Sequence, residues 1–136
     1  MKLYTKIQTL KTKSLIGAVL VGDKNQIYMS TGFEIHNTDE HVASMTSIQR
    51  AISFIKNVSP IYASENLEIH NTNLTIEEIK RNEYVSKFLQ AKNIDIILCN
   101  SSNDFDKQMN MRAGHELLGL STLERIRNNI HRGENI

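Results

Sequence analysis

The spacing of apolar residues changes at about residue 37, and this change limits the fold more than any other feature of the chain. Before that point apolar residues alternate with polar ones or form short runs, as β-strands require, over residues 2–10, 14–22 and 26–35. The run SLIGAVLVG is apolar almost throughout, which is typical of a central strand. The segment that follows, with Gly22, Asp23 and Asn25, tolerates the dihedral angles of a tight reversal. The first third of the chain therefore predicts three antiparallel strands.

A helical period begins in residues 37–58. Apolar residues recur there every three or four positions, so they share one helix face. They are Val42, Met45, Ile48, Ile52 and Ile55. Thr38 or Asp39 is a suitable N-cap, and Asn57 followed by Pro60 predicts the end of the helix.

Strands and helices alternate in the next part of the chain. A short strand at residues 65–71 precedes a helix at residues 75–93, which Thr75 and Glu78 open as a capping box. The apolar strand at residues 94–100 is expected to be buried on both faces. A meander followed by alternating strands and helices predicts an α/β fold, with a mixed five-stranded sheet flanked by helices.

Two further helices are predicted at the C-terminal end. Residues 104–119 form the first, and Gly119 can close it. A second capping box, Ser121 with Glu124, opens the next, which ends near Arg132 and leaves a frayed tail. Leu120, Leu123, Ile126 and Ile130 have helical spacing there, so that helix is expected to pack on the sheet, the alternative being a partner protein.

The composition is that of one globular domain. The chain has 136 residues, so we expect a single domain over residues 1–136, with an extra C-terminal helix at about residues 121–132. Hydrophobic residues make up 40% and charged residues 23%, which is enough for a core and a polar surface. The formal net charge of +1 gives no strong bulk attraction to nucleic acids or membranes. Nucleic-acid binding would have to come from local clusters of lysine and arginine.

The single cysteine, Cys99, excludes a disulfide framework and a cysteine-rich zinc site. It lies in the apolar run IDIILC, where a cysteine is expected to act as a small buried hydrophobe. No run approaches the roughly 18–20 apolar residues of a membrane span, and the first residues lack the apolar core of a signal peptide. We therefore expect a cytoplasmic protein.

Several short motifs occur in the order of a known fold. There are five of them in chain order: LYTKIQ in the first strand, GAVLV in the second, ASMTSI at residues 43–48, HNTN at residues 70–73 and QMNMRAGHELL at residues 108–118. In the last motif Asn110, Met111, Arg112 and Ala113 align with the pattern Asn-Glu-Arg-Ala that many ribonuclease H-like proteins carry, with methionine in place of the glutamate. Over residues 2–118 the chain resembles the ribonuclease H-like family, which implies that family's fold.

The resemblance also implies where catalysis would take place. Nucleases of this family hold two divalent metal ions on a cluster of carboxylates. The matching positions here are Lys6, Ser44, Thr72 and Gly114, with Asn71 or Asn73 in place of Thr72 if the register slips. None is an acid, and hard cations need anionic oxygen ligands. A unit charge about 4 Å from another interacts at roughly 4 kcal/mol at an effective dielectric near 20, so a lysine there repels a divalent ion.

The leading hypothesis is therefore a pseudoenzyme. It has no catalytic residues and no cofactor, and it serves as a binding, regulatory or structural module whose partner is a protein. The rival is a nuclease on RNA or RNA–DNA hybrids that needs magnesium or manganese. Its metal ligands would be displaced acids, namely Glu34, Glu40, Asp104 or Glu116.

A third hypothesis is a plain nucleic-acid-binding protein. Its phosphate contacts would come from basic residues in the first hairpin and the final helix. They are Lys2, Lys6, Lys11, Lys13, Arg125 and Arg127, with His131 and Arg132 beside them. The balanced total charge favours ordinary surface charge instead. Aromatic residues make up only 6%, so stacking platforms for single strands are scarce.

The histidines allow weaker hypotheses. His36 and His41, with the acids Glu34, Asp39 and Glu40, offer a transition-metal set, but a polar loop before an acidic helix start explains them better. His115 could be a remnant of the nuclease site, but the favoured interpretation is that it is an exposed helix residue.

His70 stays open between a residue facing the vestigial cleft and a partly buried imidazole whose hydrogen bonds are satisfied. A zinc deaminase is excluded, because HVASM lacks the required glutamate and one cysteine cannot supply the zinc ligands. Met109 and Met111 lie two apart in the last motif, so one of them is expected to be exposed.

Overall fold

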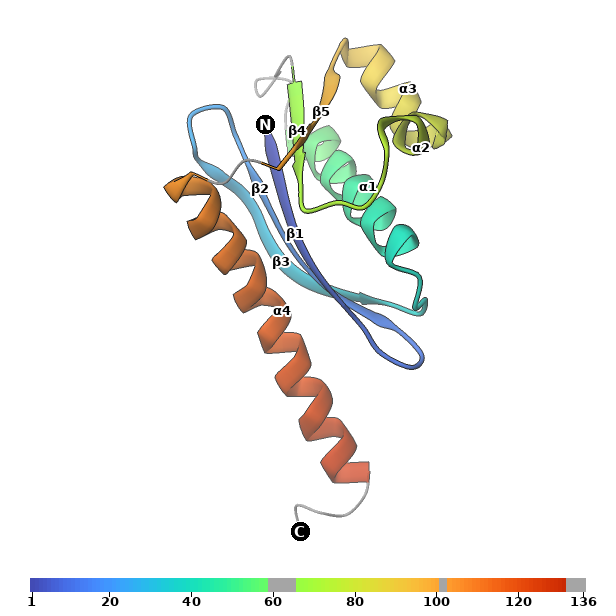
Figure 1. The fold of residues 1–136 in the computed structure, drawn as a ribbon, viewed down its shortest axis with the longest axis vertical. Coiled ribbons are helices and arrows are strands. Elements are labelled where there is room, and N and C mark those ends of the chain that lie inside the picture. Colours follow the sequence, from blue (N-terminus) through green and yellow to red (C-terminus); the bar gives the residue numbers. More distant parts are fainter. Residues whose placement is uncertain (59–65, 101–102, 132–136) are drawn as a thin grey trace.

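A computed structural model describes residues 1–58, 66–100 and 103–131 of the chain. Figure 1 shows the arrangement of its elements. They are β1 (Lys2–Thr9), β2 (Ser14–Val21), β3 (Ile27–Ile35), α1 (Glu40–Val58), β4 (Asn66–His70), α2 (Ile76–Arg81), α3 (Glu83–Lys92), β5 (Asp95–Cys99) and α4 (Asp104–His131).

The five strands form one mixed sheet in the order β3-β2-β1-β4-β5. The pairs β1–β2 and β2–β3 are antiparallel, whereas β1–β4 and β4–β5 are parallel. Every residue of β2 is buried, as its apolar sequence predicts for a strand between two neighbours. In the β2–β3 turn Gly22 N donates to the Gln26 carbonyl and Asn25 N donates to the Gly22 carbonyl, and Asn25 takes the left-handed conformation. The predicted fold class, with three antiparallel strands first, is confirmed.

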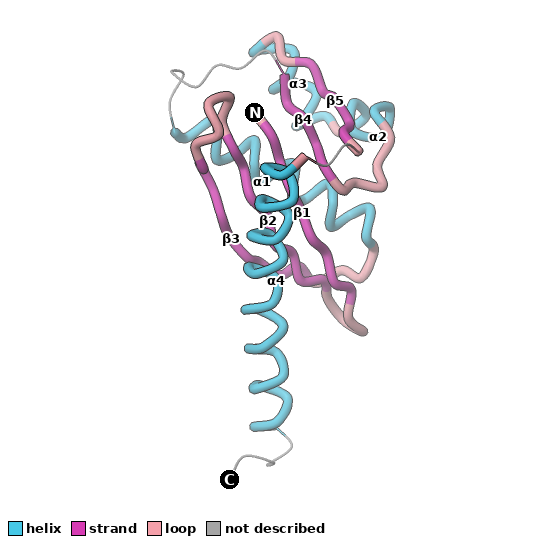
Figure 2. Tube along the Cα trace, turned by 60° about the vertical axis from the view of Figure 1, so that its left-hand side comes forward, coloured by secondary structure: helices cyan, strands magenta, loops and turns pink. Residues whose placement is uncertain are grey.

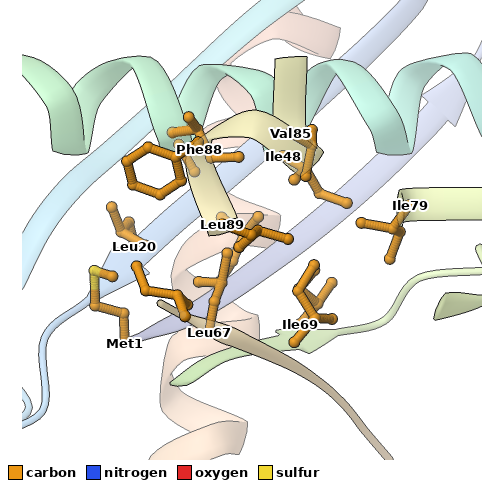
Figure 3. Close-up of a cluster of buried hydrophobic side chains, with 14 of the residues drawn as sticks. Met1, Leu20, Ile48, Leu67, Ile69, Ile79, Val85, Phe88 and Leu89 are labelled. Atoms are coloured by element: carbon orange, nitrogen blue, oxygen red, sulfur yellow. The ribbon is translucent and has the colours of Figure 1, made fainter. Parts of the chain in front are cut away.

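Helices cover both faces of the sheet (Figures 1 and 2). On one face α1, α2 and α3 bury the main core against alternate strand residues such as Leu3, Leu67 and Ile69 (Figure 3). On the other face α4 packs Met109 and Ala113 against a second cluster from β1 and β2. Alternation of side chains across each strand is what separates the two clusters.

Glycines let α4 lie very close to the sheet. A Cβ atom on Gly17 in β2 would lie 2.0 Å from the backbone oxygen of Ala113. A Cβ atom on Gly32 in β3 would lie 2.9 Å from the backbone oxygen of Glu116. Because both obstacles are backbone atoms, a larger residue at either position would push the helix away.

The predicted helix at residues 75–93 is wrong as a single element. Its Thr75–Glu78 capping box is present, but the helix stops at Asn82, whose backbone is extended. Asn82 then caps α3, its side chain accepting a hydrogen bond from Val85 N at 3.1 Å. An asparagine that bonds nearby backbone groups competes with helix continuation, which explains the break.

The two predicted C-terminal helices are instead one continuous helix, α4. Gly119 lies inside it, and Glu124 pairs with Lys13 at 2.7 Å instead of forming a capping box with Ser121. The prediction that the apolar residues of this segment pack on the sheet is largely wrong. Three of them are exposed: Leu123 by 50%, Ile126 by 44% and Ile130 by 62%.

Other sequence predictions need smaller corrections. Val42 is 41% exposed and does not join the core face of α1. The strand predicted to be buried on both faces is the edge strand β5, where Ile97 is 38% exposed. Cys99 is only half-buried. Pro60 and the tail beyond residue 131 lie outside the described residues.

Two predictions about α1 and α4 are confirmed. Asp39 caps α1, its carboxylate accepting a hydrogen bond from His41 N at 2.8 Å. Met109 is buried and Met111 is exposed.

In the described part of the chain, no helix combines the length and apolar character needed to cross a membrane.

Candidate functional site

Strands β1 and β4 separate at a junction filled by side-chain amides. The two strands pair only from Lys2–Glu68 to Tyr4–His70. Just beyond, the Asn71 amide donates to the Thr5 carbonyl at 3.3 Å and to Asn110 Oδ1 at 2.6 Å. Asn71 has φ of 65°, a left-handed conformation that asparagine tolerates better than most residues. This amide junction, made of Thr5, Asn71 and Asn110, joins β1, β4 and α4.

Two residues at the vestigial catalytic positions, Thr72 and Gly114, lie close in sequence to members of this amide junction. Thr72 directly follows Asn71, and its hydroxyl accepts a hydrogen bond from Leu74 N at 3.1 Å. Gly114 lies one helical turn after Asn110. A Cβ atom on Gly114 would have nothing within 4 Å, so there is space for a side chain that the sequence does not supply.

The remaining vestigial residues approach from two faces of the sheet. Lys6 lies opposite Gly17 in the β1–β2 ladder, and Gly17 lies beneath Ala113, so Lys6 belongs to the face covered by α4. Its side chain is exposed. Ser44 is buried in the first turns of α1, on the other face. His115 is an exposed residue of α4.

The displaced acids lie on three different elements. Glu34 in β3 pairs with Lys13 at 3.2 Å. Glu116 in α4 accepts a hydrogen bond from the Ser30 hydroxyl at 3.1 Å. The other two, Glu40 and Asp104, are exposed first residues of α1 and α4. Within the described ranges, these four carboxylates do not come together as one group of metal ligands.

The predicted phosphate-binding residues are also scattered. Lys13 bonds both Glu34 and Glu124, and the hydrogen bond with Glu124 is the main reason that the pKa of Lys13 is raised. Arg127 approaches the same two carboxylates at 3.8 and 3.9 Å. The Lys2 ammonium lies 5.3 Å from the centre of the Phe105 ring. Three residues of the set, namely Lys6, Lys11 and Arg125, are exposed and form no ion pair with the described residues.

A buried polar pair lies one turn of α4 before the amide junction. The Tyr4 hydroxyl donates to Asp106 Oδ1 at 2.5 Å, and both residues are buried. Burial, followed by the bond to Asp106, raises the pKa of Tyr4. Burial alone would raise the pKa of Asp106, but hydrogen bonds from Tyr4 and from Asn103 N outweigh it and lower that pKa.

Sequence reasoning missed this pair. An aspartate in the first turn of a helix usually serves only the helix dipole. The available signal was the reciprocal spacing of Asn103 and Asp106, which bond each other's backbone N–H groups as a capping box does.

The structure assigns the other histidines to different surroundings. His36 is exposed, and His41 Nδ1 lies 3.0 Å from Glu78 Oε2. The described residues do not bring His36 and His41 together with acids in one metal-ligating group. His70 is buried and stacks on Tyr4, with ring centroids 4.3 Å apart. His70 is therefore buried, but its Nε2 atom has no hydrogen-bond partner among the described residues, so the imidazole is not fully satisfied.

Solved structures share this architecture. LC11-RNase H1, isolated from compost by a metagenomic approach, superposes with a TM-score of 0.57 at 12% identity, covering 88% of this chain and 96% of that one. A structure of LC11-RNase H1 in complex with an RNA/DNA hybrid gives 0.59 at 13% identity, covering 88% and 97%. The chain has the ribonuclease H fold. No protein-family model matches its sequence, and no curated protein matches it either.

The ribonuclease H fold explains why these residues lie together. Its parallel β1–β4 pair and the helix after β5 bring Asn71 and Asn110 into contact, although they are 39 residues apart in sequence. What this arrangement offers chemically is a set of neutral hydrogen-bonding groups, with the ammonium group of Lys6 on the same face.

Proposed function

We propose that this chain is a non-catalytic ribonuclease H-like domain that serves as a binding module for a partner protein. The observation that carries the proposal is the amide junction of Thr5, Asn71 and Asn110. It occupies the place where β1, β4 and the last helix meet. Amide groups and a carbonyl are neutral, so they cannot offset the charge of two divalent ions.

The residues around the junction strengthen this argument. Lys6 adds a positive charge on the same face, and Gly114 and Thr72 contribute no carboxylate. The displaced acids of the rival nuclease hypothesis are engaged elsewhere or exposed at helix starts. Two-metal phosphodiester hydrolysis would need several of them to move together toward one point.

A surface on α4 favours a protein as the partner. Gly119, Leu123, Ile126 and Ile130 are spaced four, three and four residues apart, so they lie within about 60° of one another around the helix. We call these residues the α4 stripe. Its three large side chains are exposed, and a Cβ atom on Gly119 would have nothing within 4 Å. Figure 2 shows the C-terminal part of α4 extending past the end of the sheet. Such spacing suits a partner helix.

A cleavage assay tests the absence of nuclease activity. The full chain is incubated with a labelled RNA–DNA hybrid and with labelled RNA, in separate titrations of Mg²⁺ and Mn²⁺, beside an active ribonuclease H1. We expect no metal-dependent cleavage by this chain. Cleavage that disappears in Glu40→Gln or Glu116→Gln, but persists in Glu77→Gln, would establish the displaced-acid nuclease instead.

Binding of a nucleic acid without cleavage is the second candidate. It is favoured by the structural similarity to LC11-RNase H1 in complex with an RNA/DNA hybrid and by the exposure of Lys6 and Lys11. Anisotropy of a labelled hybrid at increasing salt is the direct measurement. Each phosphate contact would contribute about −0.9 to the slope of log K against log salt. The pair Lys6→Ala and Lys11→Ala should then weaken binding, whereas Lys24→Ala should not.

A further inference from the structure

Three potential metal ligands lie side by side on two neighbouring parallel strands, β4 and the edge strand β5. Glu68 and His70 belong to β4, and Cys99 of β5 is the register partner of His70. Their carboxylate, imidazole and thiol ligand atoms all lie within 4.8 Å of one another. The pairings of Lys2 with Glu68 and of Tyr4 with His70 place these side chains on the sheet face that α4 covers.

His70 supplies an independent sign that something belongs there. Its imidazole is buried, with 3% of the residue exposed, and its Nε2 atom has no hydrogen-bond partner among the described residues. The nearest carboxylate oxygen, Glu68 Oε2, is 3.6 Å away, which is too far for a hydrogen bond. A buried ring nitrogen without a partner destabilises the fold unless a bound species satisfies it.

We propose that Glu68, His70 and Cys99 form a binding site for one transition-metal ion of the zinc class. Thiolate, imidazole and carboxylate are all ligands that Zn²⁺ accepts. Zinc–ligand bonds of about 2.0–2.3 Å in a tetrahedron place neighbouring ligand atoms about 3.3–3.8 Å apart. The 3.6 Å between Glu68 Oε2 and His70 Nε2 falls in this range.

The site leaves one position open. Glu68 and Cys99 are half-buried, so a metal ion held by three protein ligands would have access to solvent for a fourth. Three protein ligands with one open position are the arrangement of many reactive zinc sites. The site would hold a single ion, and it therefore does not restore the paired-metal chemistry of a ribonuclease H.

The charges that face the site favour a cation. Burial raises the pKa of the Cys99 thiol, and the nearby carboxylates of Glu68 and Asp106 raise it further, whereas Lys2 opposes them. A metal ion binds the thiolate form of cysteine, so binding of the ion at Cys99 would release a proton.

Neighbouring residues hold the imidazole in position. Tyr4 stacks on His70 with an interplanar angle of 23°, and the hydroxyl of Tyr4 is fixed by Asp106. Tyr4 and Asp106 thus act as positioning residues around the ligands. Their arrangement gives the buried His70 ring a defined orientation before any ion binds.

The test uses the full chain without an affinity tag, with Zn²⁺ and Co²⁺ as probes. Calorimetry should give one bound ion per chain. Cobalt should give the thiolate-to-metal absorption band that only a cysteine ligand produces. Binding should also become tighter as pH rises, because the thiol must lose its proton.

Variants make the assignment specific. Cys99→Ser should abolish the thiolate band, and Glu68→Gln should weaken binding by at least about tenfold. His36→Asn removes an exposed histidine outside the site and should change neither result. Because Cys99 and Glu68 lie beside the buried His70, circular dichroism must show that each variant is folded. No saturable binding by folded wild-type chain, or an unchanged cobalt band in Cys99→Ser, would overturn the proposal.

Discussion

The side-chain amides of Asn71 and Asn110 meet at 2.6 Å and join the end of β4 to the N-terminal part of α4. This contact links two elements that no local sequence signal connects. It also determines what surrounds the would-be catalytic positions, because Thr72 follows Asn71 and Gly114 lies one turn after Asn110. Its strength can be measured directly.

Removing the Asn71 amide should destabilise the fold. Asn71→Gly keeps the left-handed backbone but loses both hydrogen bonds, so we expect a loss of about 1 kcal/mol in the free energy of unfolding. Asn71→Ala should lose about 1 kcal/mol more, because alanine is strained at φ of 65°. Urea denaturation measures both, and Asn110→Ala should match the glycine variant. Equal losses for alanine and glycine would show that the backbone there is unstrained.

Replacing two glycines by alanine should change the stability of the fold in opposite directions, because Gly17 packs against α4 whereas Gly114 has space around it. Gly17→Ala places a methyl group against the backbone of Ala113 and should destabilise the fold by about 1–3 kcal/mol or more. Gly114→Ala meets no atom and adds helix propensity, so it should stabilise the fold by up to about 1 kcal/mol. Thermal unfolding of both variants, compared with the wild type, checks the order. Tolerance of Gly17→Ala would mean that α4 is not packed as closely as described.

Tyr4→Phe should be among the more harmful conservative changes. It removes the hydroxyl that donates to the buried Asp106 carboxylate and leaves that charge with fewer partners. Hydrogen bonds to charged groups contribute about 1.5–3 kcal/mol, and a loss of this size is expected in urea denaturation. Tyr84→Phe is the matched control, because Tyr84 is 38% exposed. A smaller loss in Tyr4→Phe than in Tyr84→Phe would contradict the buried pair.

Rising alkaline pH should reduce the stability of the wild type more steeply than that of Tyr4→Phe. The pKa of Tyr4 is raised in the folded state above the ordinary value of 10.0, so the folded chain keeps a proton that the unfolded chain loses. Stability from this group is fully present below pH 10 and falls above it, by up to about 1.4 kcal/mol per pH unit. Unfolding free energies measured at several pH values between neutral and 11 give the slope. The slope above pH 10 should be shallower in Tyr4→Phe.

Charging the α4 stripe should leave the fold intact. Leu123→Lys with Ile126→Lys changes two exposed side chains, so the unfolding free energy should shift by no more than about 0.5 kcal/mol for each change. Leu120→Lys, in the half-buried residue beside Gly32, should destabilise the chain clearly. Sedimentation velocity of the wild type and the double variant then shows whether the stripe pairs with a second copy. A large loss of stability in the double variant would mean that the stripe is part of the core.

Local patterns predicted the elements whose surroundings are simple. The buried strand β2 follows from its unbroken apolar sequence, and the capping box of Thr75 and Glu78 lies where its spacing indicated. The prediction of helix ends failed where a residue is compatible both with a helix boundary and with the interior of a helix. Gly119 and Ser121 suggested a helix boundary, but contacts of α4 with the sheet and the pair between Lys13 and Glu124 carry the helix through.

The candidate sites depended more on tertiary structure. The sequence alone showed that Lys6, Ser44, Thr72 and Gly114 lack carboxylates, because residue identity requires no coordinates. It could not show that Asn71 bonds Asn110, or that Cys99 lies beside His70 and Glu68. These contacts join residues on separate elements, and their geometry depends on strand order and register.

By itself, the sequence determined the order of the strands and helical segments along the chain, since periodicity acts locally. It also determined which chemical groups are missing from the vestigial positions, since these depend only on residue type. Only the tertiary structure decided which polar groups meet, which acids stay apart and which face of α4 remains exposed. The physical reason is that hydrogen bonds and metal coordination depend on distances of a few ångströms between segments far apart in the chain.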